Sequence, residues 1–293
     1  MENKINLETL KLKKSIKELL EFGIINIDKP AGMTSFDVSD YVRKRLRLTK
    51  TSHFGTLDPM VTGVLPIALG RATKLTGFFL GEDKEYIGTM HMHEEVSLED
   101  IQKVIDKKFM GVIIQLPPVR SSVKRQERER EIKKFQLLEK KGKDVSYLVE
   151  CQGGTYVRKL VHDLGEEMGI GAHMTGLKRI RAGIFKEDKM IKREDFDDAV
   201  EDYERGKEKK LKEMINPAEI VTELHPVVEV KEEFVEKIFH GAPIDPSFLV
   251  KKQKFEKDAK ICIFAKDRFL GMFKVLNEDN VFAKSEFVLQ PIR

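Results

Sequence analysis

Residues 53–74 read HFGTLDPMVTGVLPIALGRATK, and this stretch decides how the rest of the chain is interpreted. It places one acid, Asp58, in a loop between Gly55 and Pro59 and then continues into an apolar segment at residues 65–69. The proline biases Asp58 towards extended geometry, and the glycine permits close approach by another backbone. Such a loop can hold a carboxylate at the mouth of a packed scaffold, although Asp-Pro beside glycine is also ordinary turn chemistry.

The composition is that of a globular protein with room for about two domains. The chain has 293 residues, of which 41% are hydrophobic and 35% are charged. No apolar run approaches the roughly 18 residues of a membrane-spanning helix, and the N-terminal residues lack the apolar region of a signal peptide. We therefore expect a soluble, cytoplasmic protein.

Neither a disulfide framework nor a metal centre is expected. The two cysteines, Cys151 and Cys262, lie far apart, and neither belongs to a CxxC pair. His91 and His93 would share one face of a strand, but the sequence offers no evident third ligand for zinc. We therefore predict no metal site.

Basic residues gather in particular segments, although the net charge is only +4. Clustered cations can bind a polyanion because binding depends on local neutralisation of phosphates. Such runs are also typical of solvated surfaces, so by themselves they favour nucleic acid only weakly. The clusters occupy residues 43–50, 120–134 and 178–181.

The hydrophobic pattern mixes helices and strands through the first part of the chain. Amphipathic periodicity predicts helices over residues 7–20, from Thr34 or Ser35 to Leu46, over 97–109 and after Gly154. The second of these should present a basic face beside the Asp58 loop. Strands are predicted at residues 23–27, 84–92, 111–115, 131–139, 144–151 and 174–185.

A change of composition predicts a domain boundary near Val221. Residues 195–212 are almost wholly charged and are soon followed by Asn216-Pro217, a turn-forming pair. The remaining residues predict a small β-rich module. Its strands are expected at residues 227–230, 261–265, 269–275 and 287–289, with a short helix around 232–239.

Several short motifs occur in order along nearly the whole chain. They are Asp28-Lys29-Pro30, Gly55-Thr56-Leu57-Asp58-Pro59, Val61-Thr62-Gly63-Val64-Leu65-Pro66, Ala72-Thr73-Lys74, Lys84-Glu85-Tyr86, Gly154-Thr155-Tyr156-Val157-Arg158 and Gly171-Ala172-His173-Met174 through Leu177-Lys178-Arg179. Together they closely resemble the TruB/dyskerin family of RNA pseudouridine synthases. His240-Gly241-Ala242 and residues 261–275 resemble the PUA module that usually follows.

One further pattern resembles the archaeal and eukaryotic branch of this family. It comprises Pro117-Pro118-Val119-Arg120-Ser121 with Val123-Lys124-Arg125. That branch is the catalytic subunit of box H/ACA ribonucleoproteins. The resemblance implies an α+β fold: a catalytic domain at residues 1–220, built around a mixed, largely antiparallel sheet, and a PUA β-barrel domain at residues 221–293.

The resemblance also carries functional roles onto matching residues. It implies that Asp58 is the catalytic carboxylate, acting as a nucleophile or a base; attack on the sugar, attack on the base and removal of a sugar proton remain open. Tyr86 would stack on the target base once that base has left its own stack. The other matched residues are Arg158, which would pair with Asp58; Lys29, which would support the loop; Leu177, an apolar wall; and His53, near the flipped nucleotide or in a packing role.

The implied reaction converts uridine to pseudouridine. The C1′–N1 bond breaks, the uracil turns and C1′ bonds to C5, without oxidation or net hydrolysis, so no cofactor is expected. The preferred prediction is guide-directed modification of rRNA, with a box H/ACA guide RNA and accessory Nop-type, Gar-type and kink-turn-binding ribosomal-type proteins. The alternatives are a stand-alone synthase for the tRNA T-loop and a catalytically silent RNA-binding scaffold.

Overall fold

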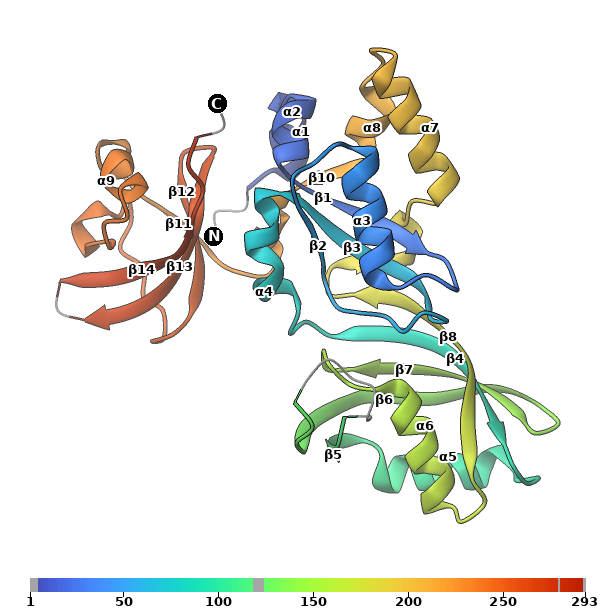
Figure 1. The fold of residues 1–293 in the computed structure, drawn as a ribbon. Helices are drawn as coiled ribbons and strands as arrows, with labels where there is room; N and C mark the ends of the chain where they lie inside the picture. The colour runs from blue at the N-terminus through green and yellow to red at the C-terminus, as the bar shows by residue number, and fades with distance from the viewer. Residues whose placement is uncertain (1–4, 118–123, 279, 292–293) are drawn as a thin grey trace.

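The computed structural model describes residues 5–117, 124–278 and 280–291. Two β-sheets with associated helices make up these residues, and most strand pairs in both sheets are antiparallel (Figure 1). The expected α+β class is therefore confirmed. Arg120 and the rest of residues 118–123, which carry part of the archaeal-type pattern, lie outside the described residues.

The larger sheet has the strand order β10-β1-β3-β8-β4-β7-β6-β5, with β2 paired to β3 and β9 paired to β8. Its one described parallel pairing joins β3 to β8 through Thr62–Lys178 and Gly63–Arg179, and this junction connects the two halves of the sheet. The strands are β1 (Phe22–Lys29), β2 (Thr51–His53), β3 (Thr62–Gly70), β4 (Lys84–Met92), β5 (Gly111–Gln115), β6 (Arg128–Lys141), β7 (Asp144–Cys151), β8 (Ala172–Ala182), β9 (Phe185–Lys186) and β10 (Ile215–Pro217).

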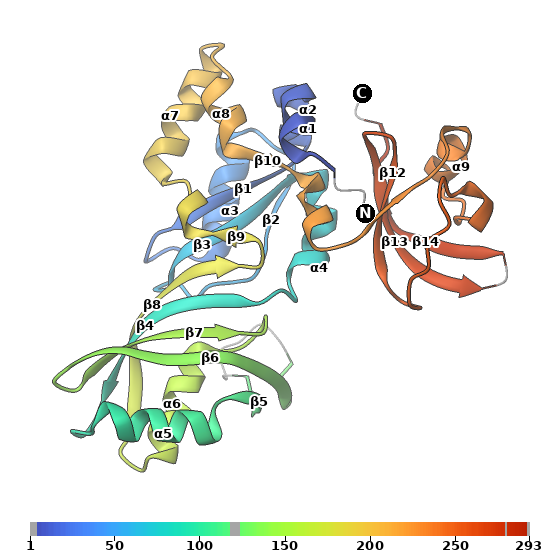
Figure 2. The ribbon, with the colours of Figure 1, turned by 180° about the vertical axis from the view of Figure 1, so that it is seen from behind.

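The helices cover the two halves of this sheet separately. Helices α2, α3, α7 and α8 pack with β1 and β3 around one core, and α5 and α6 pack with β4 and β7 around another. Helix α6 lies in front of β6 in Figure 1 and behind it in Figure 2, which shows the face of the sheet that this helix covers. The helices of this part are α1 (Leu7–Lys13), α2 (Ile16–Glu21), α3 (Ser35–Arg45), α4 (Thr76–Phe79), α5 (Leu98–Lys108), α6 (Val157–Glu167), α7 (Arg193–Glu204) and α8 (Lys209–Met214).

Local sequence explains these boundaries well. Thr34 caps α3 as predicted, and it forms a capping box with Asp37. Strand β4 alternates as predicted, because Tyr86, Met90 and Met92 face the core while the residues between them are less buried. No helix in the described part of the chain is long and apolar enough to cross a membrane.

One prediction about helices was wrong, and α7 and α8 were not predicted. Residues 7–20 form two helices because Ser15 caps a new helix that starts at Ile16. Ser15 Oγ accepts from the backbone N–H of Glu18, and the backbone N–H of Ser15 donates to the Glu18 carboxylate. The charged segment at residues 195–212 contributes most of α7 and the start of α8. Phe196 and Val200 share one buried face of α7, so this segment belongs to the core of the first unit.

The second sheet has the order β11-β12-β13-β14 and encloses a core of its own. Three of its expected strands and the short helix are confirmed, whereas the fourth strand begins at Val281 and not at residue 287. Isolated bridges join Val230 to Leu249 and Ile244 to Ala283, so residues 244–249 connect the two edges of the sheet, in keeping with the expected barrel. The elements are β11 (Val227–Glu229), α9 (Val235–Phe239), β12 (Lys260–Ala265), β13 (Arg268–Glu278) and β14 (Val281–Val288).

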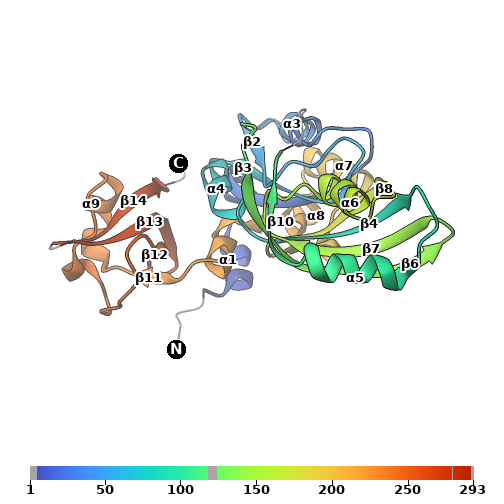
Figure 3. The same cartoon turned by 90° about the horizontal axis from the view of Figure 1, so that it is seen from below.

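The two sheets share one hydrophobic cluster where the units meet (Figure 3). The ring of Phe22 in β1 stacks on Phe269 in β13, with centroids 5.6 Å apart. Phe264 and Met272 of the second unit belong to the same buried cluster, together with Phe79 of α4. The connection is therefore a packed interface that couples the stability of the two units.

We predict that Phe269→Ala destabilises both units by about 3–5 kcal/mol, because the lost ring leaves a cavity in their shared cluster. Phe273→Ala is the matched control, since Phe273 is equally buried but belongs to the core of the second unit alone. Hydrogen exchange should accelerate in β1 for Phe269→Ala and remain unchanged there for Phe273→Ala. Unchanged exchange in β1 for both variants would contradict the coupling.

Candidate active site

A pocket of about 620 Å³ lies where the Asp58 loop meets β4, β8 and the start of α6. Asp58, Tyr86, Arg158 and Leu177, which are far apart in sequence, all line this pocket. The remaining lining residues are Gly55, Thr56, Leu57, Val61, Leu80, Gly81, Lys84, Gly153, Gly154, Thr155, Tyr156, Val157, Met174 and Arg179. The structure thus brings four of the six expected site residues into one cavity.

The Asp58 loop is fixed by hydrogen bonds on both sides of the carboxylate. The backbone N–H of Leu57 donates to Ser35 Oγ (2.8 Å), and the N–H of Val61 donates to the Asp58 carbonyl (3.0 Å). Gly63 has φ 98°, and a Cβ atom there would lie 2.2 Å from the Arg179 carbonyl oxygen. Only glycine permits this close approach of β3 to β8.

Lys29 supports the loop from behind, outside the pocket lining. Its ammonium is fully buried and donates to the carbonyls of Pro30 (2.9 Å), Pro59 (2.8 Å) and Val61 (2.8 Å). Burial lowers the pKa of Lys29, and the nearby Asp58 carboxylate opposes that shift. The position agrees with the supporting role that the resemblance implied.

Arg158 lies beside the carboxylate. Its Nη1 is 3.2 Å from Asp58 Oδ2, and the two side chains are 50% and 45% exposed. Arg158 belongs to the first turn of α6, where the helix dipole disfavours a cation and a carboxylate partner offsets this. A half-exposed ion pair contributes about 0–1 kcal/mol to stability, so its main effect here is to orient the two groups.

Tyr86 and Leu177 form the apolar part of the pocket. Tyr86 is only 7% exposed, and burial raises the pKa of its hydroxyl while the adjacent Arg179 guanidinium opposes that shift. Leu177 pairs with Gly88 in the register between β4 and β8. A Cβ atom at Gly88 would lie 2.9 Å from Leu177 Cδ1, so glycine leaves room for the leucine.

His53, like Lys29, is a predicted site residue that lies outside the pocket lining. Its Nε2 lies 3.2 Å from Oγ1 of Thr56, which lines the pocket. Burial lowers the pKa of His53, and the Arg179 cation lowers it further.

Lys84 and Arg179 line the pocket, although sequence reasoning assigned them no role. Both lie within or beside motifs that carried the resemblance, but the burial of a cation cannot be read from a motif. Gly153, at the rim, was missed as well. A Cβ atom there would lie 2.5 Å from the Leu80 carbonyl oxygen, so the loop before α6 packs directly on the end of α4.

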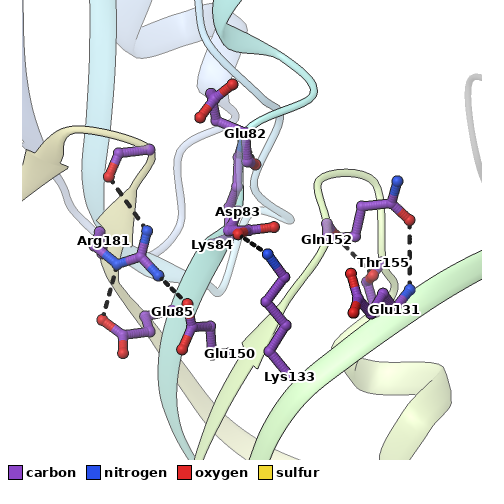
Figure 4. Close-up of polar contacts among 11 residues, drawn as sticks. Glu82, Asp83, Lys84, Glu85, Glu131, Lys133, Glu150, Gln152, Thr155 and Arg181 are labelled. Carbon is purple, nitrogen blue, oxygen red and sulfur yellow. Dashed lines mark hydrogen bonds and ion pairs between the residues drawn. The ribbon is translucent and has the colours of Figure 1, made fainter. Parts of the chain in front are cut away.

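Most basic residues of the clusters at 43–50 and 178–181 pair with carboxylates, which reduces the free positive charge on α3. Arg45 and Arg47 contact Asp197 and Glu204 of the acidic helix α7. Figure 4 shows the same for Arg181, whose guanidinium joins Glu85 (3.0 Å) to Glu150 (2.7 Å) across three strands. The other pairs are Arg43 and Lys44 with Asp40, Lys178 with Glu187 and Lys133 with Asp83.

A third histidine joins the two that the sequence placed on one face of β4. His173 lies opposite His91 in the register of β8, and its Nδ1 is 3.0 Å from His93 Nε2. Even so, the described residues contain no group of three or more His, Cys, Asp or Glu side chains that could hold a metal ion.

The pocket thus combines a carboxylate, its arginine partner and a buried tyrosine, and a carboxylate is a group that can act as a nucleophile. Family comparison identifies which enzyme class this is. Residues 43–157 match the model described as "TruB family pseudouridylate synthase (N terminal domain)". Residues 158–223 match "tRNA pseudouridylate synthase B C-terminal domain".

Similar proteins agree with these matches. "Probable tRNA pseudouridine synthase B" of Methanopyrus kandleri is 44% identical over 82% of this chain and 71% of that protein. The protein of the same name from Methanocaldococcus jannaschii is 45% identical over 79% of this chain and 69% of the relative. This chain therefore belongs to the TruB family and is an RNA pseudouridine synthase, as predicted.

Solved structures extend the similarity to nearly the whole fold. The crystal structure of a Cbf5-Nop10-Gar1 complex contains a chain that is 36% identical, with a TM-score of 0.88 over 96% of this chain and 89% of that one. An H/ACA ribonucleoprotein bound to a substrate RNA containing 2′-deoxyuridine matches with a TM-score of 0.86 at 34% identity, over 96% of this chain and 89% of that one.

We predict that Asp58→Asn lowers the rate of pseudouridine formation by ~10⁴-fold or more while RNA affinity stays nearly unchanged. The amide keeps the shape of the side chain but loses its nucleophilicity and basicity. Single-turnover mapping of pseudouridine measures the rate, and Asp106→Asn, on the exposed face of α5, is the matched control. Substantial turnover by the Asp58→Asn protein, shown to be free of deamidation, would contradict a catalytic role for Asp58.

Arg158→Met should lower the same rate by ~10²-fold or more, because the carboxylate loses the group that orients it. Arg158→Lys is the informative companion, since it keeps the charge but loses the planar fork of donors. We expect Arg158→Lys to recover part of the rate that Arg158→Met loses. Normal rates for Arg158→Met would show that the 3.2 Å contact has no catalytic consequence.

Proposed function

We propose that this chain is the catalytic subunit of an archaeal-type H/ACA particle and that it modifies rRNA under the direction of a guide RNA. The supporting observation is the extent of the structural likeness: chains from H/ACA assemblies match 96% of this chain, including the sheet after Val227. One of those assemblies contains Nop10 and Gar1, and another is bound to a substrate RNA. We propose partners of these kinds for this chain, including a guide RNA and a kink-turn-binding protein, and a cytoplasmic location.

We propose that residues 1–220 form the catalytic domain and residues 221–293 a PUA domain that binds RNA. The second unit has its own core, which suits a separate role. The shared cluster around Phe22 and Phe269 would hold that unit at a fixed position relative to the pocket. A guide held by the second unit would then present its paired target at a set distance from Asp58.

Within the pocket, we propose that Asp58 is the catalytic carboxylate and that Arg158 orients it. Tyr86 and Leu177 would receive the flipped uracil, with the tyrosine ring replacing part of the stacking that the base loses. Lys29 would keep the loop rigid through its three carbonyl contacts. His53 would support the loop through Thr56.

Stand-alone modification of tRNA is the second candidate, because the curated relatives carry the name tRNA pseudouridine synthase B. A silent RNA-binding scaffold is not retained. A scaffold does not need a carboxylate, its arginine partner and a tyrosine in one cavity, and this chain brings Asp58, Arg158 and Tyr86 together in that way.

The deciding experiment incubates the purified chain with unmodified tRNA and with an rRNA fragment, each with and without guide RNA and the accessory proteins. Pseudouridine is then mapped at single-nucleotide resolution, with the Asp58→Asn variant as the inactive control. We expect modification of the rRNA fragment only when guide and accessory proteins are present. Modification of tRNA without a guide, and no guided activity on rRNA, would establish the second candidate instead.

A further inference from the structure

Two buried cations form one side of the active-site pocket. Lys84 at the start of β4 is 4% exposed, Arg179 in β8 is 1% exposed, and both line the cavity that contains Asp58. A Cβ atom at Gly55 would lie 3.3 Å from Arg179 Nη1 and 3.7 Å from Lys84 Cε. The two side chains thus lie together behind one residue of the Asp58 loop.

Neutral carbonyl groups, not carboxylates, hold these cations. Lys84 Nζ donates to the carbonyls of Phe79 (3.4 Å), Leu80 (3.1 Å) and Glu82. Arg179 binds β3 and the loop, as its Nε donates to the Val64 carbonyl (2.7 Å) and its Nη2 to the Gly55 carbonyl (3.1 Å). Within residues 5–117, 124–278 and 280–291, neither side chain forms an ion pair with an acid.

This arrangement is unfavourable for stability, which argues for a role in the pocket. A buried cation without an anionic partner loses hydration that carbonyl dipoles only partly replace. Burial lowers the pKa of Lys84 to about 8, and the Arg179 cation contributes to the same shift. Perturbed groups of this kind gather at functional sites, where a preorganised field acts on charge that develops during the reaction.

The reaction supplies such a charge. When the C1′–N1 bond breaks, its electron pair leaves with the base, whether Asp58 bonds to C1′ or removes the C2′ proton. The released uracil carries a negative charge spread over N1, O2 and O4 until C5 bonds to C1′. C5 then bonds to C1′ as the Asp58–C1′ bond breaks or, in the other route, as C2′ regains the proton that Asp58 removed. C5 loses its proton and N1 gains one, so the overall change is an isomerisation.

We propose that Lys84 and Arg179 stabilise the uracil anion electrostatically while the base turns in the pocket. Arg179 also acts on Tyr86, because its cation opposes the rise that burial causes in the pKa of the Tyr86 hydroxyl. The low dielectric around two buried side chains strengthens their effect on an anion in the same cavity. This inference rests on uridine isomerisation in the Asp58 pocket and adds a source of stabilisation for the leaving base.

The competing explanation is purely structural: Lys84 ties the end of α4 to β4, and Arg179 ties the loop to β8. The two explanations differ in their dependence on the leaving group. Fluorine at C5 withdraws electrons and stabilises the uracil anion by itself, so 5-fluorouridine needs less help from the protein. If the substitution only misplaced the Asp58 loop, cleavage of the C1′–N1 bond would slow by the same factor for uridine and for 5-fluorouridine.

The test measures single-turnover cleavage of the C1′–N1 bond in an RNA that the unaltered protein modifies, carrying either uridine or 5-fluorouridine at the target. The measurements are made below neutral pH, where N3 of both bases stays protonated. We expect Lys84→Met to slow cleavage of uridine by ~10²-fold and that of 5-fluorouridine clearly less. Arg179→Lys keeps the positive charge. Its ratio of the 5-fluorouridine cleavage rate to the uridine cleavage rate should therefore stay close to the ratio of the unaltered protein.

Equal slowing of both bases by Lys84→Met would overturn the proposal and leave the structural explanation. Absence of turnover by the unaltered protein on any RNA would instead count against the function proposed above, so the two failures are distinguishable.

A pH profile of the unaltered protein tests the idea without relying on a variant that folds poorly. The charged groups facing Lys84 are Arg179, Glu82 and Asp83, and Cys151 faces it as a thiol whose pKa burial raises to about 12. Lys84 loses its positive charge as the pH rises through about 8, so uridine cleavage should decline above that pH. Lys84→Arg should abolish the decline because arginine stays charged, whereas a profile that is identical in the two proteins would overturn the proposal.

Discussion

The buried ammonium of Lys29 is the interaction on which the active-site geometry depends. Lys29 is the last residue of β1, and its ammonium donates to three carbonyls. Two of these carbonyls, those of Pro59 and Val61, belong to the loop that follows Asp58. All three donors of the ammonium are used, so the loop is held at several points by one rigid group. Loss of Lys29 would leave the buried Val61 carbonyl without this donor, which costs about 1–3 kcal/mol. A single side chain thus joins the stability of β1 to the position of the carboxylate.

The parallel contact between β3 and β8 then places that loop against the other half of the sheet. Asp58 precedes β3, whereas Tyr86 and Leu177 belong to β4 and β8, so the pocket exists only because the two halves meet at Gly63 and Arg179. Two features permit the contact. Gly63 removes the Cβ atom that would strike β8, and Arg179 crosses back to the carbonyls of Val64 and Gly55. The active site therefore lies where the fold requires a glycine without a Cβ atom and a buried arginine.

The sequence predicted the parts of this structure that local pattern controls. Strand β4 and the cap at Thr34 depend on neighbours within a few residues, and both were predicted correctly. The contact between Asp58 and Arg158 came from family resemblance, because spacing says nothing about residues that far apart. Helix α7 was missed because its many charges hid the apolar spacing of Phe196 and Val200. The burial of Arg179 could not be predicted, since its acceptors lie 115 and 124 residues away.

The junction between the two units has a consequence for how RNA would be positioned. Besides the shared aromatic cluster, the segment around α1 reaches both sides: Lys14 pairs with buried Glu219 before β11 (2.7 Å), and Lys13 pairs with Asp267 in the turn after β12. Burial raises the pKa of Glu219, and Lys14 opposes that shift, so the pair is most effective when both groups are charged. An interface with apolar packing resists hinge motion more than a bare linker does. If the second unit holds a guide RNA, the distance from guide to Asp58 is set by the protein, and target choice then depends on base pairing that brings a uridine to that fixed distance.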